Sequence, residues 1–154
     1  MVPDPSSSNN LSIEELLGSF LDASMRQKRN LADSFEAKVD EIATLGPVSL
    51  SGFDPEGEDW GAGWILQLLH RHRPEILPTF FGEKPNGWFS TPSEAGINYL
   101  DFQKSLLTEN FEEADRFTSA LLRQLAGKPA QLRGYVYFSE VEAIPSLDLL
   151  TLDR

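Results

Sequence analysis

The chain has 154 residues, no cysteine and a formal net charge of −11. This length suits one ordinary domain or two small ones. The lack of cysteine excludes disulfides and zinc sites with thiolate ligands. The acidic balance makes nucleic acids and anionic lipid heads poor partners, because their phosphates would be repelled.

Targeting and membrane signals are weak along the whole sequence. No apolar run approaches the ~20 residues that a membrane-spanning helix needs. The first ten residues, MVPDPSSSNN, have no basic region followed by an apolar stretch, which argues against a secretory signal. Four acids precede the first arginine, which argues against a transit peptide. We expect a soluble protein that stays in the compartment where it is made.

The first half of the chain predicts a helical domain over residues 11–82, after a disordered tail at residues 1–10. Ser12 and Glu15 have the spacing of a capping box. Apolar residues at helical spacing then continue to residue 45, which predicts one long helix, or a hairpin broken near residues 27–30.

An acidic loop follows at residues 49–59, before a helix that starts at Trp60 and ends before Pro74. A short helix is expected at residues 75–81. The segment 83–95 is rich in turn-forming residues and is predicted to be a linker.

The second half also follows a helical pattern. A helical turn that Thr91 would cap, or an entry into the next helix, is expected at residues 91–94, and a helix is expected at residues 99–107. Asn110 should cap a further helix that ends at Gly127, with Pro129 beyond it. Residues 134–138 favour extended structure, Ser139 and Glu142 have capping-box spacing, and residues 148–154 favour a helix. The fold class is therefore all-α.

The sequence contains no recognisable catalytic or metal-binding pattern. His70 and His72 are two residues apart, so they do not share a helix face as a metal pair would. A calcium loop that starts at Asp54 lacks the glycine and glutamate that its sixth and twelfth positions require. No nucleophile stands in a known catalytic motif. We therefore nominate no catalytic and no metal-ligating residue.

Aromatic residues are dense at Trp60 and Trp64 and again at Tyr135, Tyr137 and Phe138. Packing in the core explains such clusters most simply. The alternative is a flat apolar surface that receives a ligand, and the sequence leaves both open.

Three colinear blocks, GINYLDFQKSLL, NFEEADRFTSALLRQLAG and YVYFSEVEAIPSLDLLTLD, span most of residues 96–154. In order and spacing this region resembles the genomes-uncoupled-four family of tetrapyrrole-binding proteins. The resemblance implies an N-terminal helical bundle, followed at residues 96–154 by the first half of a mostly helical tetrapyrrole-binding core.

The resemblance also implies a function. Members of this family are non-catalytic regulators of chlorophyll biosynthesis that bind protoporphyrin IX and Mg-protoporphyrin IX. They stimulate magnesium chelatase through its large porphyrin-binding subunit. It implies a cyanobacterial cytoplasmic or plastid stromal location, with peripheral membrane association left open. Carried over to this chain, it makes Phe138 the foremost pocket-wall residue, with Tyr135, Val141 and Leu122 beside it.

The family core continues beyond the position that corresponds to Asp153, and its later segments complete the tetrapyrrole cradle. We therefore expect this chain to be a C-terminally truncated member that binds pigment weakly or not at all. The alternative function is a helical protein-interaction adaptor that binds no pigment.

Overall fold

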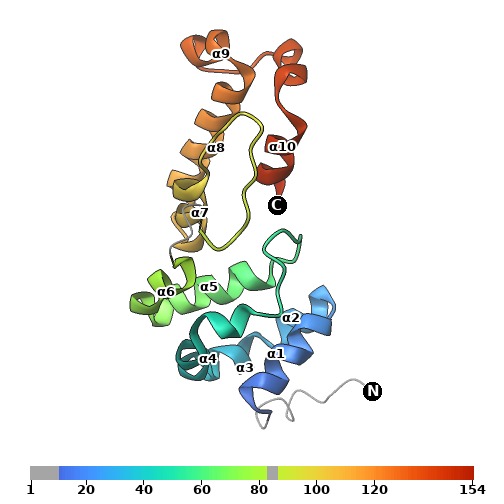
Figure 1. Cartoon of the computed structure of the whole chain (residues 1–154), viewed down its shortest axis with the longest axis vertical. Coiled ribbons are helices and arrows are strands. Elements are labelled where there is room, and N and C mark those ends of the chain that lie inside the picture. The colour runs from blue at the N-terminus through green and yellow to red at the C-terminus, as the bar shows by residue number, and fades with distance from the viewer. Residues whose placement is uncertain (1–10, 83–86) are drawn as a thin grey trace. The chain divides into compact units, whose positions relative to one another are not determined.

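The computed structural model describes residues 11–82 and 87–154. The chain divides into two compact units, with the first ending at Gly82 and the second starting at Glu83. Every regular element in the described ranges is a helix, so the all-α prediction is confirmed (Figure 1). The predicted tail at residues 1–10 and the first part of the predicted linker, residues 83–86, lie outside the described residues.

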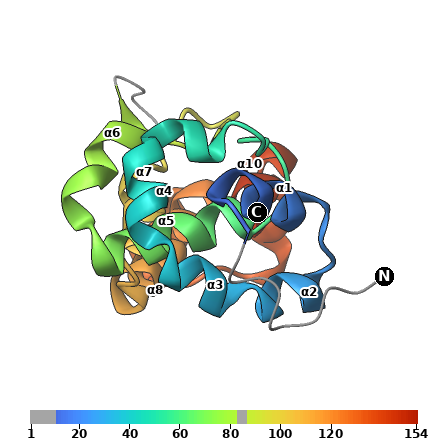
Figure 2. The same cartoon turned by 90° about the horizontal axis from the view of Figure 1, so that it is seen from below.

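The first unit consists of short helices joined by tight turns. Its elements are α1 (Ile13–Asp22), α2 (Met25–Asn30), α3 (Ala32–Ala37), α4 (Val39–Leu45), the 3-10 helix η2 (Gly46–Leu50), α5 (Gly61–His72), the 3-10 helix η3 (Pro74–Ile76) and α6 (Leu77–Phe81). Helix α4 contacts α5, and the two lie side by side in both views (Figures 1 and 2). None of the helices in the described ranges has the length and apolarity to cross a bilayer.

The single long helix or hairpin predicted over residues 12–45 is wrong, since four helices occupy this stretch. The capping box at its start is present, with Glu15 N donating to Ser12 Oγ at 3.2 Å. A second capping box begins α2, where Gln27 N donates to Ser24 Oγ at 3.4 Å and Ser24 N donates to Gln27 Oε1 at 2.9 Å. Each cap fixes a new helix start, so one continuous apolar pattern is divided between separate helices.

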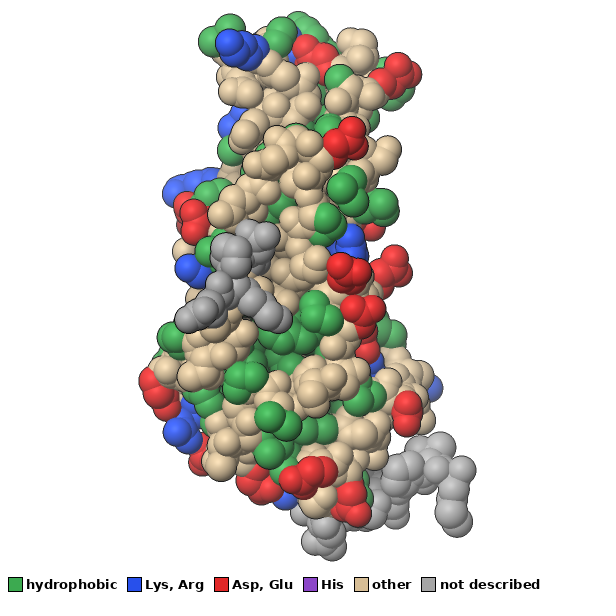
Figure 3. All heavy atoms as spheres, in the orientation of Figure 1, with side chains coloured by type: hydrophobic (Ala, Val, Ile, Leu, Met, Phe, Trp, Pro, Cys, Tyr) green, Lys and Arg blue, Asp and Glu red, His purple; other side chains and the backbone are tan. Residues whose placement is uncertain are grey.

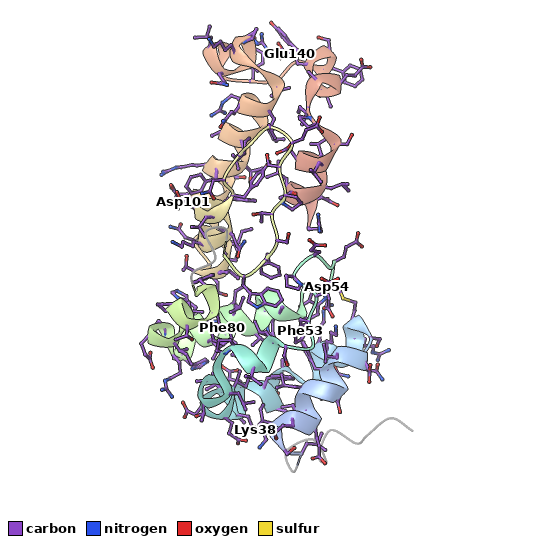
Figure 4. All side chains as sticks on the ribbon, in the orientation of Figure 1. Lys38, Phe53, Asp54, Phe80, Asp101 and Glu140 are labelled. Carbon is purple, nitrogen blue, oxygen red and sulfur yellow. The ribbon has the colours of Figure 1, made fainter. Side chains whose placement is uncertain are left out.

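Phe20 is the centre of the core of the first unit. Its fully buried ring lies 4.7 Å from the ring centroid of Phe35 and 6.2 Å from that of Phe53. The indole rings of Trp60 and Trp64 also pack on it, at 6.2 and 5.8 Å between centroids. Phe53, which is labelled in Figure 4, lies in the acidic loop at residues 49–59 and packs into a core formed by α1, α3 and α5.

The second unit contains α7 (Leu100–Leu107), α8 (Phe111–Ala126), α9 (Lys128–Arg133), the 3-10 helix η4 (Phe138–Ala143) and α10 (Ser146–Asp153). Asn110 caps α8 as predicted, since its Oδ1 accepts from Glu113 N at 3.3 Å. Gly127 ends α8 with a φ of +113°, which favours glycine. Pro129 does not prevent a further helix. It lies in the first turn of α9, where the backbone N–H that proline lacks would have no partner within the helix.

Two local predictions for the second unit are wrong, and a third holds only in part. Residues 91–94 form no helical turn, since Glu94 N donates to Asp148 Oδ2 at 3.0 Å and not to a cap at Thr91. Residues 134–138 have no strand partner among the described residues; Gly134 lies in a turn, Tyr137 keeps extended dihedrals and Phe138 begins η4. The expected cap of Ser139 with Glu142 is replaced by a pair two residues earlier, in which Tyr137 N donates to Glu140 Oε2 at 2.8 Å.

Asp148 of α10 joins that helix to the extended segment before α7. Its side chain is fully buried and accepts four hydrogen bonds from residues about 50 positions earlier. The donors are Ser93 Oγ, Glu94 N at 3.0 Å, Ala95 N at 3.2 Å and Tyr99 Oη at 2.7 Å. A carboxylate satisfied on both oxygens in this way orders the segment 93–99 against α10.

The electrostatics of this cluster favour the ionised carboxylate. Burial acts to raise the pKa of Asp148, but the hydrogen bonds from Ser93, Tyr99, Ala95 and Glu94 outweigh it, and the net pKa is lowered from 3.8. Burial, followed by the hydrogen bond to Asp148, raises the pKa of Tyr99. The pair is therefore a neutral phenol that donates to a charged acceptor at neutral pH.

The lowered pKa of Asp148 predicts acid sensitivity of the second unit. A group whose pKa is lower in the folded state stabilises the fold above its unfolded pKa, and this stability is lost as pH falls through the folded value. We expect the difference in unfolding free energy between the native chain and Asp148→Asn to be constant at neutral pH and to shrink below pH 3.8. Urea titrations at a series of pH values measure it. A difference that stays constant into acid would contradict the prediction.

Candidate functional site

The most exposed apolar surface of the second unit is the segment between the end of α9 and η4. We call residues 132–141 the aromatic turn. Leu132 is 90% exposed and Phe138 is 94% exposed, while Tyr135, Tyr137 and Val141 are about half exposed. Figure 3 shows hydrophobic side chains at the surface over this end of the unit. A group of large apolar side chains that are exposed to solvent is typical of a surface that binds a partner or a ligand.

Arg133 contacts several parts of the aromatic turn at once. Its guanidinium carbon lies 3.6 Å from the ring centroid of Tyr137 and 4.9 Å from that of Tyr135. Its Nη2 donates to Tyr135 O at 3.0 Å and to Glu140 Oε2 at 2.5 Å. The two tyrosine rings stand at 84° to one another with centroids 5.4 Å apart. These contacts preorganise the rings before any ligand arrives.

The charges within the turn are already matched. The pKa of Glu140 is lowered by the hydrogen bond from the Tyr137 backbone N–H, with a further contribution from Arg133. The hydrogen bond between the two tyrosine hydroxyls raises the pKa of Tyr135. Because an ionised Glu140 neutralises Arg133, this arginine orients the rings and is not a free cation for a ligand carboxylate.

The structure brings three of the four predicted site residues together. Tyr135, Phe138 and Val141 all lie in the aromatic turn and are exposed. Leu122 lies on α8 and is half-buried, and α8 contacts η4. The assignment of these four residues to a binding site remains a prediction.

A separate pocket lies between α7 and α8 and encloses about 440 Å³. It is lined by apolar side chains with a polar rim: Gly96, Ile97, Asn98, Asp101, Phe102, Phe117, Ala120, Leu121 and Gln124. Asp101 and Glu140 lie well apart in Figure 4, so this pocket is distinct from the aromatic turn. No local signal in the sequence predicts this pocket, because its two walls come from separate helices.

Metal-binding geometry does not appear within residues 11–82 and 87–154, where no three potential ligands of the His, Asp or Glu type gather. His72, at the end of α5, instead lies with its Nε2 3.0 Å from Glu36 Oε1. The basic end of α5 thus faces acidic side chains of α3 and α4, since Arg73 also pairs with Asp40 at 2.6 Å.

The second unit is thus an all-α domain that presents a preorganised aromatic surface. Residues 92–154 match the family model described as GUN4-like. The match confirms, for this segment, the resemblance to the genomes-uncoupled-four family.

Individual relatives agree with this assignment. A Ycf53-like protein of Synechocystis is 39% identical over 92 residues, covering 59% of this chain and 40% of the relative. The ycf53 protein of Pyropia yezoensis is 35% identical over 88 residues, covering 57% of this chain and 37% of that protein. A chloroplastic tetrapyrrole-binding protein of Arabidopsis thaliana is 44% identical over 52 residues, covering 34% of this chain and 20% of that protein. The chain spans at most two fifths of the length of these relatives.

Proposed function

We propose that this chain is a non-catalytic, tetrapyrrole-binding regulator, and that the aromatic turn forms one wall of its pigment site. The observation that supports this most is a coincidence of position. The segment that matches the GUN4-like family model, residues 92–154, is also the one that exposes Phe138 and its neighbours. A related protein in Arabidopsis thaliana is named for tetrapyrrole binding.

The geometry of the turn suits a flat apolar ligand. A porphyrin presents a broad π-face, which aromatic rings cover by offset or edge contacts. Tyr135 and Tyr137 are fixed by Arg133, so little rotational freedom is lost when a ligand packs on them. Phe138, Val141 and Leu122 would supply further apolar contact from η4 and α8.

The proposed ligands are protoporphyrin IX and Mg-protoporphyrin IX, carried by a protein without a resident metal. The proposed partner is the large porphyrin-binding subunit of magnesium chelatase, which this chain would stimulate in chlorophyll biosynthesis. The proposed location is the cyanobacterial cytoplasm or the plastid stroma. These proposals concern the whole protein. The relatives are more than twice as long as the segment that they share with this chain.

Titration with deuteroporphyrin IX and its magnesium form tests the pigment site. We expect weak but saturable binding, seen as a shifted Soret band. Phe138→Ala should weaken it about 30-fold, because a phenylalanine that becomes buried contributes roughly 2 kcal/mol. Phe111→Ala is the matched control, since Phe111 is also exposed but lies at the start of α8.

Equal affinities of the Phe138→Ala and Phe111→Ala variants would remove the aromatic turn from the site. No saturable binding by the native chain would contradict the pigment site proposed for these residues. If the chain nevertheless retained a chelatase subunit in a pull-down, the alternative function, a helical adaptor without pigment binding, would be favoured.

A further inference from the structure

The first unit contains a second hollow, and neither the family match nor the aromatic turn accounts for it. It encloses about 430 Å³, within the range of small-molecule sites, and lies between α2, the start of α3 and the start of α5. Its lining residues are Met25, Lys28, Arg29, Ala32, Trp60 and Trp64. We call it the tryptophan pocket. All of it lies before residue 83, outside the segment that matches the family.

The apolar wall of the tryptophan pocket is rigid. The Trp64 indole stacks on Phe20 with an interplanar angle of 28° and meets Phe35 edge-on at 83°. The Trp60 indole also packs edge-on against Phe20, at 84°, and its Nε1 donates to the Met25 sulfur. Both indoles are only half-buried, so each ring is fixed by the core and still accessible. Rings held in this way bind a planar ligand with little loss of entropy.

The charge at the pocket is positive although the chain is strongly acidic. Helix α2 contributes Arg26, Lys28 and Arg29 and no acid. Lys28 is only 6% exposed and pairs with Asp59, whose other oxygen accepts from Gly61 N at 2.8 Å. Burial opposes the ionisation of Asp59, but the hydrogen bonds from Lys28 and Gly61 lower its pKa overall.

Arg29 is the charged residue of the pocket lining that is available to pair with a ligand. It lines the pocket and is exposed, and within residues 11–82 and 87–154 no carboxylate pairs with it. A guanidinium with open donors at the edge of an aromatic wall matches a carboxylate attached to a flat ring. A cationic ligand would instead be repelled by Arg29.

We propose that the tryptophan pocket binds a small aromatic carboxylate, which stacks on Trp60 and Trp64 and pairs with Arg29. The site is independent of the pigment site proposed above, since no residue is shared between them. The protein would therefore bind this ligand in addition to the pigment, at a separate site.

The chain offers a clean optical test, because it contains three tryptophans and two of them line the pocket. In a Trp88→Phe background, Trp emission reports the pocket alone. Naphthalene-2-carboxylate is the probe, and the charge-reversed 2-naphthylmethylammonium is its control. We expect saturable quenching by the carboxylate and at least tenfold weaker binding of the ammonium compound.

Two variants locate the site. Arg29→Gln should weaken binding about tenfold, as expected for the loss of one charge-assisted hydrogen bond. Arg26→Gln is its matched control on the same helix, outside the pocket lining, and should bind normally. Ala32→Leu should abolish quenching by filling the pocket, while circular dichroism confirms that each variant is folded.

Several results would overturn the proposal. These are no saturable quenching of the native pocket, equal binding of the two naphthalene compounds, or equal affinities of the two arginine variants. Displacement of the probe by an oligoglutamate peptide would make an acidic protein segment the occupant instead. A dimer in sedimentation that Ala32→Leu dissociates would make a second copy the occupant. Unchanged probe binding in Phe138→Ala, with altered porphyrin binding, would separate this site from the proposed function.

Discussion

Replacing Asp148 with alanine is expected to lower the free energy of unfolding of the second unit by about 4 kcal/mol. The carboxylate accepts from two hydroxyls and two backbone N–H groups, and it is fully buried. Each buried donor that loses its acceptor costs on the order of 1–3 kcal/mol, with some recovery through water. Since small domains are stable by about 5–15 kcal/mol, this loss approaches the stability of the whole unit.

Hydrogen exchange measured peptide by peptide shows whether the destabilisation is confined to the second unit. Amides of α7, α8 and the segment 93–99 should exchange much faster in Asp148→Ala. Asp153→Ala is the matched control, because Asp153 is on the same helix and exposed. Tyr99→Phe removes one of the four donors and should cost only about 1 kcal/mol. Equal protection in the Asp148 and Asp153 variants would contradict the structural role of this carboxylate.

Replacing Phe20 with alanine is expected to destabilise the first unit by about 3–5 kcal/mol, the usual range for a buried phenylalanine. Its ring is fully buried and contacts four other aromatic rings. No neighbour can close the space without leaving its own ring contacts, so the cavity should persist. The tryptophan pocket should lose probe binding at the same time, because Phe20 supports both indoles.

Urea unfolding followed by Trp60 and Trp64 emission, in the Trp88→Phe background, measures this destabilisation. Phe111→Ala makes the same substitution at an exposed site and should shift the midpoint little. A midpoint for Phe20→Ala close to that of Phe111→Ala would show that the aromatic cluster does not determine the stability of the first unit.

Local signals predicted those features that local chemistry decides. The Ser12 and Asn110 caps and the glycine end of α8 were predicted, because a cap depends on residues three or four positions apart. The same rule could have found the start of α2, since Ser24 and Gln27 have the capping-box spacing. Apolar periodicity concealed it, because four successive short helices can keep the same face toward one core.

The predicted site residues were found through family resemblance, and their exposure could not be read from spacing. Tyr135, Phe138 and Val141 have the composition of a core strand, yet Arg133 and Glu140 fold them into a turn. The two pockets also had no sequence signal, since each depends on the distance between helices. Such distances follow from side-chain packing across the unit.

The sequence by itself determined the helical class, the absence of thiol chemistry, the caps at Ser12 and Asn110 and the family resemblance of residues 92–154. Each of these follows from composition or from residues near one another in the chain. Only the tertiary structure decided that Asp148 is a buried acceptor and that Arg29 lies beside two supported indoles. The physical reason is that burial and pairing depend on donors and rings that lie tens of residues away, which periodicity does not encode.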